Sequence, residues 1–174
     1  MNKKIASVLL VISALFSSWL YWGSNLKIEQ VLTSREWQSK MTTLIDTQLV
    51  ERMVGPLKEG ALVSNVKYLP NGTYIRSSIV RLYSDKHGHR QVTDVINVSE
   101  SGKWSISDNY LIVSPTSFKD VSSAQSQTFT SKQLNLITKL IRMDAQQSRR
   151  IDIVNENTLL LTSLGHGSTL LTTY

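Results

Sequence analysis

The sequence predicts a single N-terminal transmembrane helix followed by a mainly β domain of the α+β class, an antiparallel barrel or strongly curved sheet with two helices. An uncharged apolar run from Ile5 to Trp22 opens the chain and predicts the transmembrane helix. Beyond it, roughly eight or nine short stretches rich in β-branched and aromatic residues alternate with turn signals. Two further stretches have the apolar spacing of a helix.

The apolar run is long enough to cross a membrane, because a spanning helix needs roughly 17–25 residues. Lys3 and Lys4 precede it, so the positive-inside rule places the N-terminus in the cytoplasm. We therefore expect a cytoplasmic stub at residues 1–4, a single-pass anchor at residues 5–22 and an exported domain at residues 23–174.

A cleaved signal peptide is the alternative, since it also has a basic start and an apolar stretch. Such a peptide ends in paired small residues around the cleavage site. The small residues near the end of this run lack that pairing: Gly23, for example, has Tyr21 two positions before it. An uncleaved anchor is favoured, and both interpretations export the C-terminal part.

Composition limits the chemistry of the exported part. The chain has no cysteine, which excludes disulfides, thiolate metal sites and a cysteine nucleophile. The formal net charge is +6, but the two signs are interspersed and no long basic block occurs, so we expect no direct contact with nucleic acid. One domain is expected from the length.

The first element expected after the anchor is a helix. Residues 33–36 (Thr-Ser-Arg-Glu) have the form of a capping box, which satisfies amides at a helix start. Apolar residues follow at positions i, i+4, i+7 and i+8, namely Trp37, Met41, Leu44 and Ile45. The spacing predicts a helix to about Leu49, and Gly55-Pro56 ends any continuation.

The strands follow. Residues 61–69 and 73–83 are joined by Pro70-Asn71-Gly72, and the Asn-Gly pair predicts a hairpin because both residues tolerate positive φ. Further strands are predicted at residues 91–98, 103–107, 110–114, 118–122, 149–154, 158–164 and 168–172. A second capping box, residues 130–133, predicts a helix of about three turns with apolar residues at Leu134, Ile137, Leu140 and Ile141.

Motifs of catalysis are lacking: the sequence has no nucleophile elbow, P-loop, zincin pair or dinucleotide fingerprint. His87-Gly88-His89 offers two imidazoles without a carboxylate at a recognisable ligand spacing. His166 lies beside Ser168, but its flanking glycines are better explained by a hairpin tip. We expect neither an enzyme nor a cofactor.

Gly102-Lys103-Trp104 at a strand start resembles the glycine-x-tryptophan signature of lipocalin-type barrels, in which the tryptophan closes one end. An eight-stranded barrel is either filled by side chains or holds one small molecule. A lipocalin-like barrel here would therefore have an interior able to take a small apolar ligand.

Five longer stretches of the sequence are distinctive: residues 19–24 (WLYWGS), 31–37 (VLTSREW), 100–111 (ESGKWSISDNYL), 144–152 (DAQQSRRID) and 161–170 (LTSLGHGSTL). They resemble the ToxS family, whose members are inner-membrane partners of the transcription factor ToxR in vibrios and relatives. The resemblance runs essentially from end to end and is weakest at residues 46–98 and in the last four residues.

The resemblance implies a non-enzymatic accessory protein of the bacterial inner membrane. Its periplasmic domain would associate with that of a ToxR-like transcription factor, protect it from proteolysis, promote its active state and take part in sensing bile acids. Related periplasmic pairs build a lipocalin-like barrel that strands of the partner complete, with the bile salt in the cavity. A stub at residues 1–4 is too short to bind DNA, so a signal would have to pass through the partner.

We predict that the partner adds to an exposed strand edge, and that an amphipathic steroid binds the barrel interior. The aromatic residues predicted to line that interior are Trp104, Tyr74, Tyr110 and Phe118. A stand-alone periplasmic carrier or chaperone for apolar molecules is the alternative function. An anchored hydrolase that uses His166 and Ser168 is a third class, less favoured by the residues.

Overall fold

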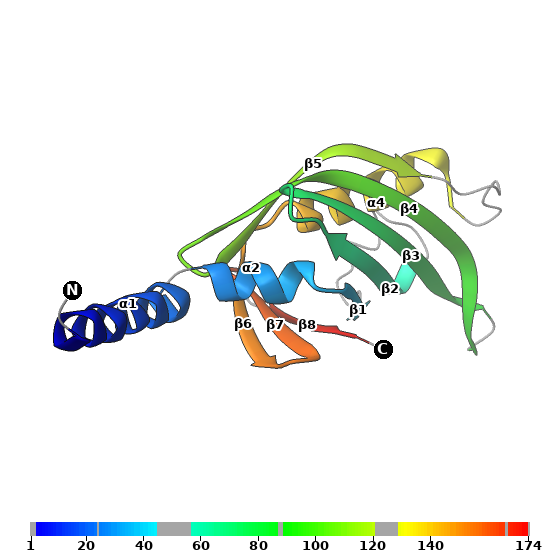
Figure 1. The fold of residues 1–174 in the computed structure, drawn as a ribbon. Coiled ribbons are helices and arrows are strands. Elements are labelled where there is room, and N and C mark those ends of the chain that lie inside the picture. The colour runs from blue at the N-terminus through cyan, green and yellow to red at the C-terminus, as the bar shows by residue number, and fades with distance from the viewer. Residues whose placement is uncertain are drawn as a thin grey trace.

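The structure is a computed structural model that describes residues 3–23, 25–44, 57–86, 89–120, 129–165 and 167–173. Within these ranges eight strands form a closed antiparallel barrel, in which each strand pairs with the next and the last pairs with the first (Figure 1). The strands are β1 (Glu36–Leu44), β2 (Leu57–Tyr68), β3 (Thr73–Lys86), β4 (His89–Ser107), β5 (Tyr110–Asp120), β6 (Arg149–Asn155), β7 (Thr158–Ser163) and β8 (Gly167–Thr172). The helices are α1 (Lys3–Gly23), α2 (Leu26–Thr33) and α4 (Ser131–Ala145).

The expected antiparallel barrel is confirmed and is consistent with a lipocalin-like barrel, and most of its elements are confirmed. The hairpin of β2 and β3 turns at Gly72, whose φ is +76°. The Asp108-Asn109 turn between β4 and β5 also has positive φ at both residues. Helix α4 begins with the predicted capping box, in which Thr130 and Gln133 exchange hydrogen bonds. The three C-terminal strands lie where they were predicted.

The helix predicted from Thr33 is wrong within the described residues. Thr33 ends α2, and its hydroxyl donates to the carbonyl oxygen of Glu29 (2.7 Å). The residues after it form β1, which pairs with β2 along its whole length. A spacing of four places Trp37 and Met41 on one face of a strand as well as of a helix. Hydrogen bonding to β2 therefore overrides the local helical pattern.

Two breaks expected between the predicted strands, at residues 99–102 and 115–117, are also wrong, because strands pass through them. β4 continues through Ser101-Gly102, and β5 continues through Pro115-Thr116. The pairing of these strands shifts register at Ser101/Gly102. The glycine and the proline thus mark a β-bulge between β4 and β5, which bends these strands.

One end of the barrel is closed by a packed core and by α2. The largest fully buried side chains of this core are Trp37, Tyr68, Tyr74 and Leu32. Leu32 lies on α2, and the Trp37 indole donates from Nε1 to its carbonyl oxygen (2.9 Å). Helix α2 is therefore part of the barrel's hydrophobic core.

A second core lies toward the other end, where α4 packs against the barrel. Its buried members include Leu57, Val80, Leu82, Phe129 and Ile137. Ile137 lies on α4, so this helix supplies one wall of the interior at that end. The space between helix and strands holds the cavity described below.

Helix α1 extends away from the barrel (Figure 1), and its large apolar side chains from Ile5 to Trp19 are exposed. Over the described residues, no helix meets the combined length and apolarity required of a membrane-spanning segment. The anchor at residues 5–22, its orientation and the domain boundaries at residues 1–4 and 23–174 stay predictions.

Candidate functional site

The interior of the barrel at the α4 end holds an apolar cavity of about 380 Å³. Its volume lies within the range of roughly 300–1,000 Å³ typical of small-molecule sites. Strands β1 to β3 form one side and α4 forms the other. The lining residues are Met41, Thr43, Leu57, Gly60, Leu62, Val80, Leu82, Ile137, Leu140, Ile141 and Asp144.

A smaller compartment of about 40 Å³ lies deeper in the barrel and is rich in polar groups. It shares four lining residues with the apolar cavity: Met41, Leu62, Ile141 and Asp144. The polar side chains that line it include Ser64, Ser78, Arg76, Glu100, Asp144 and Arg149. The two spaces are therefore neighbours with different chemistry, and Asp144 lies between them.

One set of polar groups in the deeper compartment is centred on Glu100, whose side chain is only 3 % exposed. The Tyr74 hydroxyl donates to its Oε1, and Arg76 Nη1 lies 3.4 Å from the same oxygen. The Arg76 guanidinium also lies over the Tyr74 ring, 5.5 Å from its centroid. Nearby, the hydroxyls of Ser64 and Ser78 are 2.7 Å apart. The buried carboxylate and the guanidinium thus compensate each other's charge.

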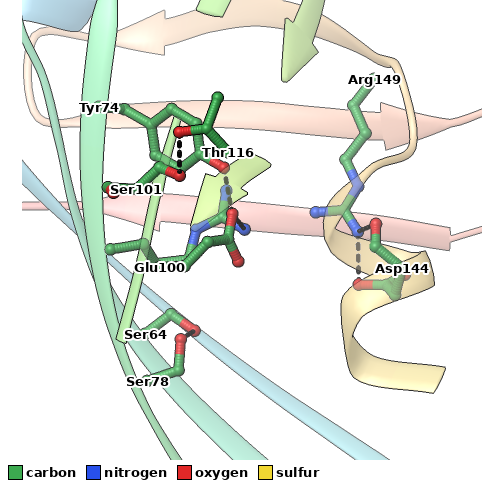
Figure 2. A network of polar contacts seen from close by, with 9 residues as sticks. Ser64, Tyr74, Ser78, Glu100, Ser101, Thr116, Asp144 and Arg149 are labelled. Atoms are coloured by element: carbon green, nitrogen blue, oxygen red, sulfur yellow. Dashed lines mark hydrogen bonds and ion pairs between the residues drawn. The ribbon is translucent and has the colours of Figure 1, made fainter. Parts of the chain in front are cut away.

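A second ion pair joins β6 to α4. Arg149 Nη2 donates to Asp144 Oδ2 (2.6 Å) and also to the Asp144 carbonyl oxygen (3.2 Å). Figure 2 shows the two side chains pointing toward one another at the end of the helix, apart from the Tyr74 and Glu100 group. The cation also sits favourably at the C-terminus of α4, where carbonyl oxygens lack helical partners.

Burial raises the pKa of both tyrosines in this region, Tyr68 and Tyr74. Burial raises the pKa of Tyr74, and the hydrogen bond to Glu100 and that carboxylate's charge raise it further. Burial also raises the pKa of Tyr68, against the opposing effect of Arg76. Both phenols are therefore held in the neutral, hydrogen-donating form.

The four aromatic residues predicted to line a ligand site lie at different places. Phe118 lines the polar compartment. Tyr74 lies in the core and contacts Glu100, and Trp104 closes the α2 end, where its indole donates to the carbonyl oxygen of Leu69 (3.1 Å). Tyr110 begins β5 and pairs with Arg150 of β6. Ligand binding by these four residues stays a prediction.

Some of the other residues considered in the sequence analysis lie outside the residues that the structure describes. His87, Gly88 and His166 lie outside the described residues, as do residues 45–56 and 121–128. The described part of the chain contains no cluster of three or more His, Asp or Glu side chains placed to hold a metal ion.

The barrel closes along a narrow seam between β1 and β8. Only Gln38 and Ser39 of β1 pair with β8, opposite Thr172 and Leu171. Beyond that point residues 40–44 of β1 pair with β2 on one side, and no described strand pairs with their other side. β5 is likewise joined to β6 at only Tyr110 and Leu111, but β5 also contacts α4. The edge at residues 40–44 is called the β1 edge below.

Comparisons with known proteins match this chain over almost its whole length. The family model described as "Trans-membrane regulatory protein ToxS" matches residues 21–172. The chain belongs to the ToxS family. A relative from Vibrio cholerae serotype O1 is 62% identical over 170 residues, which cover 98% of this chain and 96% of the relative. One from Vibrio parahaemolyticus serotype O3:K6 is 57% identical over 171 residues, 98% of each chain.

Both relatives carry the name "Transmembrane regulatory protein ToxS". The resemblance read from the sequence is therefore confirmed at the level of the ToxS family. The names of the family and its members support membrane association and a regulatory, accessory role, and they favour a non-enzymatic one.

The interior charged residues were missed by the sequence reasoning, although a signal for them exists. Arg149 is in phase with buried Ile151 on β6, and Arg76 is in phase with Tyr74 and Ser78 on β3. A charged residue that alternates in step with buried neighbours points into the barrel. Glu100, the partner of Arg76, is found by the same rule, because it is in phase with buried Val98 on β4.

Proposed function

We propose that this ToxS-family protein is a membrane-anchored accessory protein that binds, stabilises and activates a ToxR-like transmembrane transcription factor, and that the pair senses bile acids. Membership of the ToxS family over nearly the whole chain carries this proposal. The anchor would be a single pass at residues 5–22 in the bacterial inner membrane, with the N-terminus cytoplasmic and the barrel periplasmic. The partner is contacted by the barrel, with no direct contact to nucleic acid.

The β1 edge is the place where a partner strand would add. Residues 40–44 present one row of backbone N–H and C=O groups that no described strand satisfies. An extended segment can pair with such a row, and its backbone hydrogen bonds supply affinity. The edge of β5 is a poorer candidate because α4 lies against that strand.

Partner binding explains stabilisation by mass action. A protein that binds the folded form of its partner stabilises it by RT ln(1 + [L]/Kd), about 2.7 kcal/mol at a hundredfold excess over Kd. The partner's open, protease-sensitive fraction falls by the corresponding factor. No enzymatic step is required of the accessory chain.

The absence of cysteine makes a site-specific crosslinking test possible. A thiol-reactive photocrosslinker would be placed on the full-length chain at Thr42→Cys, which lies on the β1 edge. Ser77→Cys is the control: it is also exposed, but it lies on β3 and is paired with strands on both sides. We expect crosslinks to a co-expressed ToxR-like partner from position 42 and few from position 77.

Equal or reversed yields would contradict addition at the β1 edge. Hydrogen exchange on the complex provides a second measurement, with new protection expected at residues 40–44. If no strand of the barrel gained protection, strand addition would be excluded altogether. Bile-acid sensing needs a separate test. A bile acid titrated into the complex in nanodiscs should change the tryptophan fluorescence. An unchanged signal would contradict the proposal that the pair senses bile acids.

A stand-alone carrier of apolar molecules is the second candidate, and the apolar cavity of about 380 Å³ favours it. The two functions differ in what they require. A carrier would bind its ligand with the same affinity whether or not the ToxR-like partner is present. The accessory function expects ligand binding and partner binding to strengthen each other.

A further inference from the structure

We propose that Arg149 binds the anionic group of an amphipathic ligand whose apolar body fills the larger cavity, and that this group displaces Asp144 and loosens α4 from the barrel. The inference rests on the ligand-sensing part of the proposed function, and it does not depend on which partner the barrel binds. It assigns the orientation of the ligand and the helix that responds to it.

The arrangement of the two spaces sets the orientation. The larger cavity is lined by apolar side chains apart from Thr43 and Asp144, whereas the deeper compartment is lined by two arginines. Because the spaces share Met41, Leu62, Ile141 and Asp144, one elongated molecule can occupy both. The deeper compartment, about 40 Å³, has room for a small charged group but not for an apolar body. A ligand would therefore enter with its charged end first.

The two arginines differ in how easily they can change partner. Arg76 is paired with Glu100, which is 3 % exposed and would be left as a buried charge if the pair separated. Arg149 is paired with Asp144, whose side chain is 40 % exposed and can be hydrated in place. Leaving a buried charge unpaired costs several kcal/mol, whereas exposing one to water costs little. Arg149 is thus the cation available for exchange.

The exchange removes contacts that hold α4. Arg149 donates to both the carboxylate and the carbonyl oxygen of Asp144, in the last turn of α4. The same helix covers the larger cavity with Ile137, Leu140 and Ile141. A ligand that draws the guanidinium away from Asp144 while filling the cavity therefore acts twice on one helix. The expected result is weaker attachment of the C-terminal end of α4.

A pair of fluorescent probes tests whether the anionic group is recognised. Anilinonaphthalenesulfonate and N-phenylnaphthylamine share an aromatic body, and only the first carries a sulfonate. Both would be titrated into the full-length protein in nanodiscs, with empty nanodiscs subtracted. We expect Arg149→Gln to weaken binding of the sulfonate probe about tenfold while changing binding of the neutral probe less than twofold.

The neighbouring arginine supplies a matched control. Arg150 follows Arg149 on β6, but its side chain is 59 % exposed and pairs with Asp152 at the surface. Arg150→Gln should leave the affinity of both probes unchanged. Asp144→Asn should strengthen sulfonate binding several-fold, because it frees Arg149 without removing the cation. Circular dichroism of each variant checks that the barrel is folded.

Hydrogen exchange tests the response of α4. The sulfonate probe should increase exchange in the last turns of α4, and the neutral probe should not. If Arg149→Gln and Arg150→Gln affected the sulfonate probe equally, Arg149 would not bind the anion and the inference would fail while ligand sensing stood. If neither probe bound the wild-type protein above the nanodisc background, the inference and the ligand-sensing proposal would both fail.

Discussion

At the scale of single residues, the interior of this barrel is unusual in burying charge. Glu100 and Arg76 lie within a core of apolar and aromatic side chains, and the Tyr74 hydroxyl donates a hydrogen bond to the Glu100 carboxylate. Each charge is acceptable because a partner lies within reach, since an isolated buried ion costs many kcal/mol. The stability of the barrel therefore depends on the protonation states of a few side chains.

The raised pKa values of Tyr68 and Tyr74 predict a loss of stability at alkaline pH. In the unfolded chain these phenols ionise at about pH 10, whereas in the barrel they stay protonated above it. The unfolded state therefore releases protons first, and the free energy of unfolding falls as pH rises above about 10. Below that pH both states are protonated and this contribution is constant.

The measurement is urea unfolding of the wild-type chain and of Tyr74→Phe at about pH 9 and about pH 11, with tryptophan fluorescence as the signal. The variant should lose about 1.5–3 kcal/mol at the lower pH, because a hydrogen bond to a charged group is removed. Its further loss at the higher pH should be smaller than that of the wild type. An equal pH-dependent loss in both proteins would mean that Tyr74 ionises normally in the fold. Tyrosinate absorbance, titrated in parallel, reports the same ionisation directly.

At the scale of elements, the barrel depends on a bulge where β3, β4 and β5 meet. Gly102 lies at the register shift between β4 and β5. A Cβ atom there would come within 2.3 Å of the Ser114 carbonyl oxygen and 2.9 Å of the Tyr74 ring. The neighbouring strand can approach this closely only because the position has no side chain. The bulge also orients Trp104, which closes the α2 end two residues later.

Gly102→Ala should destabilise the barrel by about 3 kcal/mol or prevent its folding, because the clash is with backbone atoms that cannot move aside. Gly60→Ala is the matched control, since a Cβ at that position of β2 meets no atom within 4 Å. That variant should be neutral or gain about 0.4–1 kcal/mol through a less flexible unfolded chain. Thermal unfolding of both full-length variants measures the difference. Similar melting temperatures for the two would show that the strands adjust at Gly102.

At the scale of the whole molecule, the barrel is closely connected to the N-terminal helix. Helix α1 ends at Gly23 and α2 begins at Leu26, so few residues separate them. Helix α2 is fixed to the barrel by the buried side chain of Leu32. The Asn25 amide also donates to the carbonyl oxygen of Ile106 (3.3 Å). Contacts therefore hold α2 to the barrel from a point two residues after the end of α1.

If α1 serves as a tether in the membrane, removing it should weaken association with a membrane-anchored partner more than replacing it. Two anchored domains meet at a high effective concentration, which can raise apparent affinity by about 10²–10⁴. A chain with residues 5–22 replaced by an unrelated apolar span should co-purify with the partner as the wild type does. A chain secreted without this segment should co-purify poorly at equal expression. Loss of association in the replacement chain would instead indicate specific contacts within the membrane.

The sequence by itself determined the features that depend on neighbouring residues. The apolar run, the Asn71-Gly72 turn and the capping box at Thr130 each act within a few positions. These features could therefore be predicted from the sequence. Membership of the ToxS family was also predicted from the sequence. Of the four aromatic residues predicted for the ligand site, however, only Phe118 lines the interior compartments described here.

Only the tertiary structure decided the features that depend on distant residues. Trp37 and Met41 are spaced for a helix, yet they lie on a strand because β2 pairs with them from far along the chain. Arg76 meets Glu100, which lies 24 positions along the chain, because β3 pairs with β4 at these two residues. The β1 edge likewise exists because β1 and β8 separate after two paired residues. Strand pairing joins residues that are far apart in the sequence, so its energy appears only when the barrel closes.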